Sequence, residues 1–275
     1  MELIEFRNDK PRKLKEALQF YVSGLSNFEV SKILSRKDVK VNGKRTKENL
    51  DLKENDQVCV YVQNQVYFDV LYADKNIVVL NKVRPIETNS NLSKQTLESE
   101  LRKSYPTARA IHRLDTNTLG LVCFALNDNA EKELKNAFKK GDVVKKYVAV
   151  VNRKNVKSHE KFCDYYEKDS KSGVLKVKNH GKPINEIRLE YDLLAMQDDL
   201  ASILVRLHTG KTHQIRAQLA FHNIFILGDG KYGDKELNRK HKKSYQQLKS
   251  VYLHFTNLEK LKYLEEKIFE IDNTF

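Results

Sequence analysis

Several short stretches of the sequence place charged side chains beside glycines and between apolar segments. They are residues 74–82, 112–120, 146–147, 209–216 and 228–233. The second stretch contains a single acidic residue, Asp115. A carboxylate in such a place could serve as a nucleophile or could stabilise a developing positive charge. It could equally cap a turn through Thr118, so the residue alone leaves both roles open.

Three similar-looking motifs are excluded first. Gly210-Lys211-Thr212 matches the end of a P-loop, but that motif requires a glycine where this chain has Val205. His112-Arg113-Leu114-Asp115 inverts the last two residues of the kinase catalytic loop and lacks every companion kinase motif. His208 and His213 have no third ligand at a recognisable metal spacing, so no metal site is predicted.

The remaining pattern resembles the RluA-type pseudouridine synthases. The family's central signature, His-Arg-Leu-Asp followed by two variable residues and Thr-Ser-Gly, stands at residues 112–120 with Leu119 in place of serine. A later signature, Thr-Gly-Arg-Thr-His-Gln-Ile-Arg, stands at residues 209–216 with Lys211 in place of the first arginine. The closing Gly-Asp-x-x-Tyr-Gly is intact at residues 228–233. Two long signatures in the right order are far more specific than any single motif.

The resemblance extends over residues 66–275, and besides Lys211 a loop and Leu119 depart from it. Where the family usually has Lys-Pro-x-Gly after its second strand, this chain has Lys82-Val83-Arg84-Pro85, without the glycine and with the proline shifted. Lys82 itself is retained. The change to Leu119 removes a hydroxyl close to the expected catalytic loop.

The resemblance implies a reaction in which uracil is detached from its ribose within RNA, rotated, and rejoined through a carbon–carbon bond without a cofactor. By the same resemblance Asp115 is the catalytic aspartate. Arg216 is the partner whose guanidinium keeps a partly desolvated carboxylate ionised, although an arginine there could instead bind phosphate. Tyr147 matches the family's active-site tyrosine, whose ring can stack on the target base, and the alternative is a core tyrosine of a strand.

The reaction also requires that the target nucleotide leave the RNA stack. The resemblance suggests that Arg113, with its long side chain and planar head group, occupies the vacated place, and a surface salt bridge is the alternative. It further suggests that Leu253 is an apolar residue of the pocket.

These motifs must be positioned by strands with a few helices among them. Helices are predicted at residues 130–138 and 212–221. The chain lacks the regular alternation of strand and helix that a doubly wound sheet requires. We therefore predict an α+β catalytic domain over residues 66–275 with a large mixed or antiparallel sheet. Its predicted strands are residues 68–72, 77–80, 121–126, 147–151, 174–177, 187–194, 202–207 and 251–255.

Residues 1–62 form a smaller unit in front of this domain. Apolar spacing predicts helices at residues 12–22 and 27–34, and Asn42-Gly43 predicts a tight hairpin turn before a closing strand at residues 58–62. The pattern resembles the S-four RNA-binding module, in which two helices and a hairpin present a basic face to RNA. The alternative is a small α+β cap with ordinary surface charge. The residues expected on or near the RNA-binding face are Arg36, Lys37, Lys40, Lys44 and Arg45.

The formal net charge of +13 is distributed unevenly along the 275 residues. Residues 131–182 hold fifteen basic and seven acidic side chains, and residues 231–249 hold seven and two. Such clusters favour a polyanionic partner bound with salt-sensitive affinity, although a lysine-rich solvated surface would look the same. Both clusters are expected to line the approach to the site, with Lys240, Lys242 and Lys243 contacting phosphates.

Composition limits the class and the compartment of the protein. Hydrophobic residues at 40% exclude wholesale disorder. No apolar run reaches the roughly 18 residues of a membrane span, and the first residues do not form a signal peptide. Cys59, Cys123 and Cys163 are widely spaced within strand-like stretches, which predicts buried, reduced thiols. We therefore expect a globular cytoplasmic protein, by default a monomer.

The sequence thus predicts an RNA pseudouridine synthase that isomerises specific uridines of structured RNA. Ribosomal RNA is the expected substrate because of the front module, transfer RNA is the alternative, and DNA is not expected. A rival from another class is a non-catalytic RNA-binding or ribosome-assembly factor with the same fold. Asp115, Tyr147 and Arg216 argue against that rival, because a binding protein has no need of all three.

Overall fold

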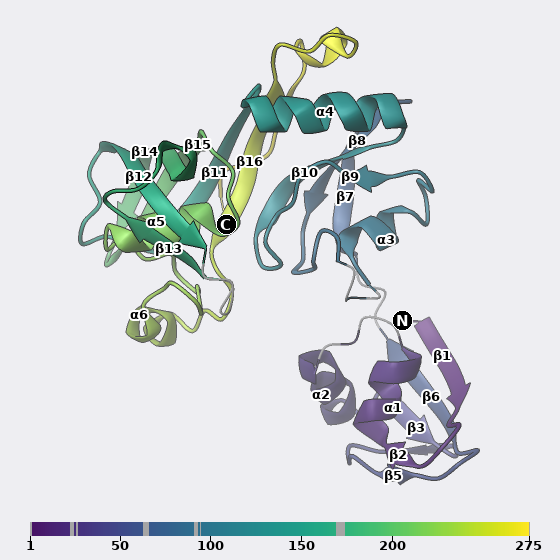
Figure 1. Cartoon of the computed structure of the whole chain (residues 1–275). Helices are drawn as coiled ribbons and strands as arrows, with labels where there is room; N and C mark the ends of the chain where they lie inside the picture. The colour runs from purple at the N-terminus through teal and green to yellow at the C-terminus, as the bar shows by residue number, and fades with distance from the viewer. Residues whose placement is uncertain are drawn as a thin grey trace. The chain divides into compact units, whose positions relative to one another are not determined.

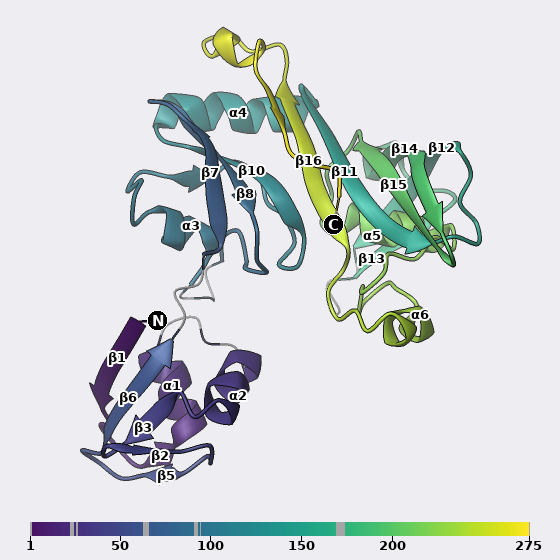
Figure 2. The same cartoon turned by 180° about the vertical axis from the view of Figure 1, so that it is seen from behind.

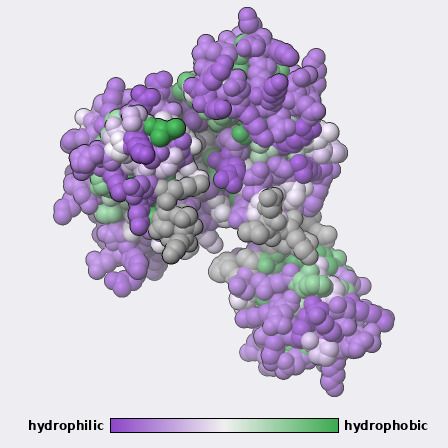
Figure 3. Space-filling model, viewed as in Figure 1, coloured by the Kyte–Doolittle hydropathy of each residue, from purple (hydrophilic) through white to green (hydrophobic). Residues whose placement is uncertain are grey.

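The computed structural model of the chain describes residues 2–22, 25, 27–62, 66–90, 93, 95–168 and 174–274. These residues form two compact units (Figures 1 and 2). The first unit holds the described residues up to Val66 together with Ser90, Ser93 and Gln95, and the second holds the other described residues from Tyr67 onward. The face shown in Figure 3 is predominantly hydrophilic in both units.

The first unit combines a small sheet with two helices. Its elements are β1 (Glu2–Arg7), β2 (Arg12–Lys13), α1 (Leu14–Tyr21), α2 (Asn27–Ser35), β3 (Val39–Val41), β4 (Lys44–Arg45), β5 (Asp51–Leu52) and β6 (Gln57–Val62). The strand order is β1-β6-β3-β4, and β2 pairs separately with β5. Leu14 and Leu18 of α1 and Val30 of α2 share one buried core with Val39 and Val58 of the sheet. The two helices and the closing strand predicted for this unit are present.

The predicted hairpin between β3 and β4 is also present. Asn42 and Gly43 have φ angles of 48° and 79°, the two positive values that a type I′ turn requires. Strand β1, by contrast, is not evident from the sequence pattern, because the adjacent Leu3 and Ile4 break the alternation of apolar and polar residues. In the structure Ile4 packs on the core while Leu3 is 48% exposed.

Eleven strands of the second unit form one sheet (Figure 2). The order is β13-β12-β14-β15-β11-β16-β10-β8-β7, with β17 paired to β16 and β9 to β10. The β10–β16 pair is parallel and the other ladders among the described strands are antiparallel. The predicted α+β domain with a large mixed sheet is confirmed. The strands are β7 (Phe68–Ala73), β8 (Ile77–Lys82), β9 (Arg109–Ala110), β10 (Leu119–Ala125), β11 (Val143–Asn152), β12 (His159–Lys168), β13 (Leu175–Lys178), β14 (Glu186–Gln197), β15 (Leu200–Leu207), β16 (Leu248–Phe255) and β17 (Ile268–Glu270).

Both faces of the central strands are buried. Successive side chains of a strand point to opposite faces, and in β8 Val78 and Val79 belong to two different cores. The first core includes side chains of α3 (Leu97–Leu101) and α5 (Gln214–Phe221), and the second includes side chains of α4 (Asp128–Lys140). Because both faces are covered, β8 and β10 read as continuous apolar runs in the sequence.

The helices of this unit end where local sequence signals stop them. The Asn127 side chain accepts a hydrogen bond from the Ala130 N–H at 3.0 Å and caps α4, and Gly141 ends this helix with a φ angle of 89°. Helix α5 begins two residues later than predicted, because His213 takes the left-handed conformation with a φ angle of 59°. Within the described ranges, no helix is long and apolar enough to cross a membrane.

The expectation that all three cysteines are buried is wrong. Cys123 is buried in β10, whereas Cys59 in β6 is half-buried and Cys163 in β12 is exposed. All three are free thiols. Strand β12 carries mostly polar side chains, so it is not evident from apolar patterning and one of its faces meets solvent.

Candidate active site

The second unit contains a cavity of about 1230 Å³. Two of the sequence signatures form a large part of its wall, since every residue of 110–118 and of 207–216 lines it. The remaining wall comes from residues 87–89, the C-terminal part of α4, strand β11, residues 184–188, Lys231 and the start of β16. The structure therefore brings together stretches that lie about a hundred residues apart in the sequence.

Asp115 lies on the loop between β9 and β10, and a buried lysine holds this loop. Lys82, the last residue of β8, is fully buried, and its Nζ donates to the carbonyl oxygens of Ile86, Asp115 and Thr116 at 2.9 Å each. An ammonium group has three N–H donors, so three carbonyl acceptors match its charged form. Burial lowers the pKa of Lys82 to about 7, and the negative charge of Asp115 opposes this shift.

The loop after β8, which lacks the glycine of the family pattern, contacts the loop that carries Asp115. The Ile86 N–H donates to the Thr116 carbonyl at 3.1 Å and so joins the two loops. On the other side of Asp115, Gly120 is the second residue of β10 and has a φ angle of 94°. A Cβ atom on Gly120 would lie 2.0 Å from the carbonyl oxygen of Ser250, so only glycine fits there. Leu119, which replaces the family's serine, is half-buried at the start of β10.

One carboxylate oxygen of Asp115 is bound by Arg216 of α5. The Arg216 Nη1 donates to Asp115 Oδ2 at 2.8 Å, while Nε and Nη2 donate to the two carboxylate oxygens of Asp229 at 2.7 and 2.8 Å. The planar guanidinium suits this two-sided contact. Arg216 is 8% exposed and Asp229 is 1% exposed. The two carboxylates thus fix the position of the arginine from opposite sides.

The hydrogen bonds of this network outweigh the effect of burial. Burial raises the pKa of Asp229, but Arg216 and the backbone N–H groups of Lys231 and Tyr232 bring it below the usual value. Burial acts to lower the pKa of Arg216, but its hydrogen bonds to Asp229 and Asp115 have the larger effect and raise this pKa above its usual value. The negative charge of Asp229 offsets the positive charge of Arg216, so Asp115 is not required as the counter-ion of this arginine.

The second carboxylate oxygen of Asp115, Oδ1, accepts no hydrogen bond from the described residues. The Asp115 side chain is 22% exposed and lines the cavity. A carboxylate anchored through one oxygen and open at the other can attack an electron-poor carbon or stabilise a cation. His213 Nε2 lies 4.0 Å from the anchored oxygen, and burial lowers the pKa of His213 despite the opposing charge of Asp115.

Tyr147 belongs both to the cavity wall and to the core. It lies on β11, is 7% exposed, packs in the first core and lines the cavity. Burial and the negative charge of Asp115 raise the pKa of Tyr147 to about 12, and a hydrogen bond with Ser250 opposes the shift. The hydroxyl therefore stays protonated near neutral pH and acts there as a hydrogen-bond donor.

Of the other two predicted site residues, one lines the cavity and the other does not. Arg113 is exposed and lines the cavity, and within the described residues it forms no salt bridge. Leu253 is 1% exposed and packs in the second core beside α4. The prediction that Leu253 lines the pocket is therefore wrong, and Leu248 supplies the apolar side chain of β16 in the wall.

The two basic clusters lie differently with respect to the cavity. Residues of the first cluster line it, among them Lys135, Lys139, Lys140 and Lys145. Lys240, Lys242 and Lys243 of the second cluster are exposed but are not part of the wall, and Lys240 forms an ion pair with Asp199 at 2.7 Å. That these three lysines line the approach to the site and contact phosphates stays a prediction.

Two of the basic residues predicted for the first unit lie beside one tyrosine ring. The Lys40 Nζ and the Arg45 guanidinium lie 5.6 and 5.4 Å from the centroid of the Tyr61 ring, within the range of cation–π contacts. Lys40 is half-buried, and the remaining members of the set are exposed. Those exposed residues are Arg36, Lys37, Lys44 and Arg45.

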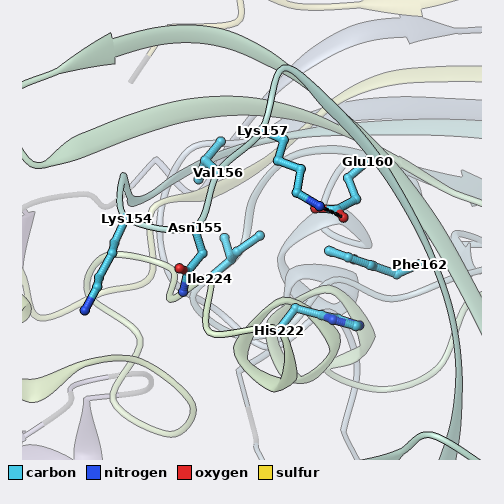
Figure 4. Close-up of a pocket in the computed structure, with 8 residues that line it drawn as sticks. All are labelled: Lys154, Asn155, Val156, Lys157, Glu160, Phe162, His222 and Ile224. Atoms are coloured by element: carbon cyan, nitrogen blue, oxygen red, sulfur yellow. Dashed lines mark hydrogen bonds and ion pairs between the residues drawn. The ribbon is translucent and has the colours of Figure 1, made fainter.

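A second pocket of about 420 Å³ lies beside the C-terminal end of α5 (Figure 4). The Phe162 and His222 rings stack in it with their centroids 3.7 Å apart, and Lys157 forms an ion pair with Glu160 on its wall (Figure 4). Its one carboxylate is thus already paired. Throughout the described ranges, no cluster of His, Cys, Asp or Glu side chains could hold a metal ion. The larger cavity is the stronger candidate for chemistry.

Sequence reasoning did not assign roles to two residues of the site. Asp229 stands in the Gly-Asp-x-x-Tyr-Gly signature, which marks its position but not its partner. Lys82 begins the atypical Lys82–Pro85 stretch, and the one sequence feature that points to it is that the family's lysine is retained at this position. Both residues lie far from Asp115 in the sequence. Lys82 donates a hydrogen bond to the backbone carbonyl of Asp115, and Asp229 holds Arg216, which contacts the Asp115 carboxylate.

Comparison with known proteins places this geometry in a family. The sequence profile of the RNA pseudouridylate synthases matches residues 70–221. An uncharacterized RNA pseudouridine synthase of Mycoplasma capricolum is 31% identical over 95% of this chain and 94% of its own length. A ribosomal large subunit pseudouridine synthase C of Rickettsia conorii is 28% identical over 89% of this chain and 86% of its own length.

A solved structure shares the fold. Human RNA pseudouridylate synthase domain containing 1 matches 77% of this chain and 85% of its own, with a TM-score of 0.62 at 22% identity. The profile covers more than half of the chain, and the relative from Mycoplasma capricolum covers nearly all of it. The chain therefore belongs to the RNA pseudouridylate synthase family.

Proposed function

We propose that the enzyme converts specific uridines of ribosomal RNA to pseudouridine, with Asp115 as its catalytic carboxylate. The observation that carries the proposal is the state of this side chain. One oxygen is anchored by Arg216, which Asp229 holds from the other side, and the second oxygen is open to a cavity large enough for a nucleotide.

The reaction requires three changes in covalent structure. The bond between C1′ of the ribose and N1 of uracil breaks, with its electron pair leaving on the base. After the base rotates, its C5 forms a bond to C1′, and a proton is lost from C5 while N1 gains one. The Asp115 carboxylate supports the electron-poor C1′ between these events, either by a covalent bond or by its charge.

Tyr147 and Arg113 have separate roles in the proposal. Tyr147 presents a ring with a protonated hydroxyl in the wall of the cavity that Asp115 also lines, which suits stacking on a neutral base and hydrogen bonding to it. Arg113 is exposed at the cavity and free of a described salt-bridge partner, which suits insertion into the stack that the target nucleotide leaves.

Ribosomal RNA is proposed as the substrate because the relative named for the ribosomal large subunit covers 89% of this chain. The first unit is proposed to be an S-four-like RNA-binding module over residues 1–62, with the cations around Tyr61 on its binding face. The proposal also places the enzyme in the cytoplasm as a monomer, and three free cysteines, one of them exposed, fit a reducing compartment.

The test is pseudouridine mapping on unmodified transcripts of ribosomal RNA and transfer RNA incubated with the purified protein. We expect pseudouridine at a small number of sites in ribosomal RNA. Asp115→Asn keeps the volume of the side chain but removes its charge, and should abolish product while RNA binding is retained. Asp192→Asn is the matched control, because the Asp192 side chain is 62% exposed on β14, and it should retain full activity.

Each outcome of the mapping decides one part of the proposal. Product in transfer RNA alone would replace ribosomal RNA with the alternative substrate. No product in either RNA would favour a binding or ribosome-assembly factor. Full turnover by Asp115→Asn would remove Asp115 from the catalytic role while leaving the enzyme assignment in place.

A further inference from the structure

Lys145 is a buried cation without a counter-ion in the described part of the protein. It lies on β11 opposite Leu253 of β16, is 7% exposed, and lines the cavity. No hydrogen bond or ion pair joins its Nζ to a described residue. The other two strongly buried cations of the site are held, Lys82 by three carbonyls and Arg216 by two carboxylates.

The neighbours of Lys145 do not compensate its charge. Its Nζ lies 5.7 Å from the centroid of the Phe138 ring, and such a contact recovers only part of the hydration that burial removes. His112 stacks on the same ring, and burial and the charge of Lys145 lower the pKa of His112 to about 3, so its imidazole is neutral. Burial lowers the pKa of Lys145 as well, and no described carboxylate opposes that shift.

The wall of the cavity leaves the Lys145 ammonium open to an anion. A Cβ atom on Gly210 would lie 3.6 Å from Nζ, so a side chain at this position would cover the ammonium on that side. Lys139 and Lys140 at the end of α4 line the same cavity and are exposed. Nine Lys and Arg side chains against three Asp and Glu side chains line the cavity, and a field of that sign concentrates anions.

We propose that Lys145 binds a backbone phosphate of the RNA that flanks the nucleotide held in the cavity. The proposal rests on the proposed function for the identity of the anion. A phosphodiester brings one negative charge and acceptor oxygens, which is what a buried ammonium without a counter-ion lacks. Lys145 is accordingly a binding and positioning residue, and it takes no part in the bond changes at C1′.

The decisive comparison is Lys145→Met against Lys146→Met. Both remove one lysine charge from the same strand, but Lys146 Nζ lies 4.8 Å from the centroid of the Tyr252 ring and is not part of the cavity wall. The probe is a single-stranded oligouridine RNA, whose dissociation constant is measured by fluorescence anisotropy over a series of salt concentrations. Thermal unfolding of the free protein is measured in parallel, with Lys145→Arg as a variant that keeps the charge.

Lys145→Met should weaken RNA binding about 5- to 20-fold at low salt and reduce the slope of log K against log salt by about 0.7. It should also raise the unfolding temperature, since it removes a buried charge that the free protein does not pair. Lys146→Met should change neither the slope nor the RNA affinity by a comparable amount, and Lys145→Arg should retain the slope.

A lower unfolding temperature for Lys145→Met with an unchanged salt slope would show a structural lysine and overturn the proposal. The binding measurement needs no catalysis, so the two proposals fail separately. If no pseudouridine forms but the slope falls, the proposed function fails and the phosphate site stands. If pseudouridine forms with wild-type KM in Lys145→Met and the slope is unchanged, the phosphate site fails and the function stands.

Discussion

The cavity of the second unit and the hairpin of the first hold their charges in opposite ways. Arg216 at the cavity is bound by two carboxylates, and Lys82 behind the Asp115 loop is buried against three carbonyls. In the hairpin, Lys44 and Arg45 are exposed, and the Arg45 head group lies 5.4 Å from the Tyr61 ring centroid. The first arrangement orients one side chain, and the second leaves its charges available to a partner.

The difference follows from the cost of taking an ion out of water, which is several kcal/mol. Arg216 and Lys82 are buried with partners, so removing one partner should have a large effect that is confined to stability and to the chemical step. Exposed charges act on a polyanion through weak, additive and screened attraction. Substitutions in the two regions should therefore differ both in size and in the quantity that they change.

Asp229→Asn should produce the largest loss of stability. It leaves Arg216 buried with Asp115 as its one remaining carboxylate, and breaking a buried ion pair in this way costs about 3–5 kcal/mol. The free energy of unfolding is measured by urea denaturation. The control is Asp192→Asn at an exposed position, which should stay within about 0.5 kcal/mol of wild type. Equal stability of the two variants would mean that Arg216 finds a replacement partner.

Arg216→Lys should lower kcat by about 10²- to 10³-fold with little change in KM. A lysine keeps the charge but cannot contact Asp115 and Asp229 together through a planar fork. Steady-state kinetics on the mapped RNA measure both constants. A rise in KM with unchanged kcat would instead support the phosphate-binding role that the sequence leaves open for Arg216.

The sequence predicts the residues that line the cavity better than the residues that hold them in place. Asp115 and Arg216 lie in the two long signatures and Tyr147 in the short stretch 146–147, and all three line one cavity. The partnership of Arg216 with Asp229 depends on a loop that turns back onto α5, which no local pattern records. Leu253 was misplaced because the sheet is buried on both faces, so an apolar strand residue does not reveal which face it occupies.

The same reasoning explains which strands the sequence predicts. Central strands such as β8 and β10 are apolar on both faces and are recognised as runs. Strand β12 is largely polar, with side chains on one face in solvent, and its alternation is too weak to be identified. The exposure of Cys163 on this strand follows from the same position in the sheet.

The pH dependence of the free energy of unfolding tests how the buried charge of Lys82 is held, with Lys82→Met as the reference. The pKa of Lys82 is about 7 in the folded protein against 10.5 for an unperturbed lysine, so between these values the unfolded chain binds the proton more tightly. The stability of wild type relative to Lys82→Met should therefore rise with pH across this window, by at most about 1.4 kcal/mol per pH unit, and level off below pH 7.

Urea denaturation of both proteins between pH 7 and pH 10 measures this difference, and titrations of other groups cancel in the comparison. A flat difference over the whole range would show that the three carbonyl acceptors keep Lys82 charged as strongly as water does. The lysine would then support Asp115 as a permanent cation.

Substitutions in the hairpin should give the smallest effects, and these should appear in KM. Arg45→Met and Lys44→Met remove exposed charges, so each should raise KM about 2- to 5-fold, reduce the salt slope of RNA binding by about 0.7–0.9, and leave kcat unchanged. Lys103→Met is the control, because Lys103 is also exposed but is paired with Glu100. An equal slope in all three variants would make the first unit a cap with ordinary surface charge. A loss confined to the two hairpin variants would instead make the first unit an RNA-binding module, whose charges attract the substrate that the buried charges of the second unit orient.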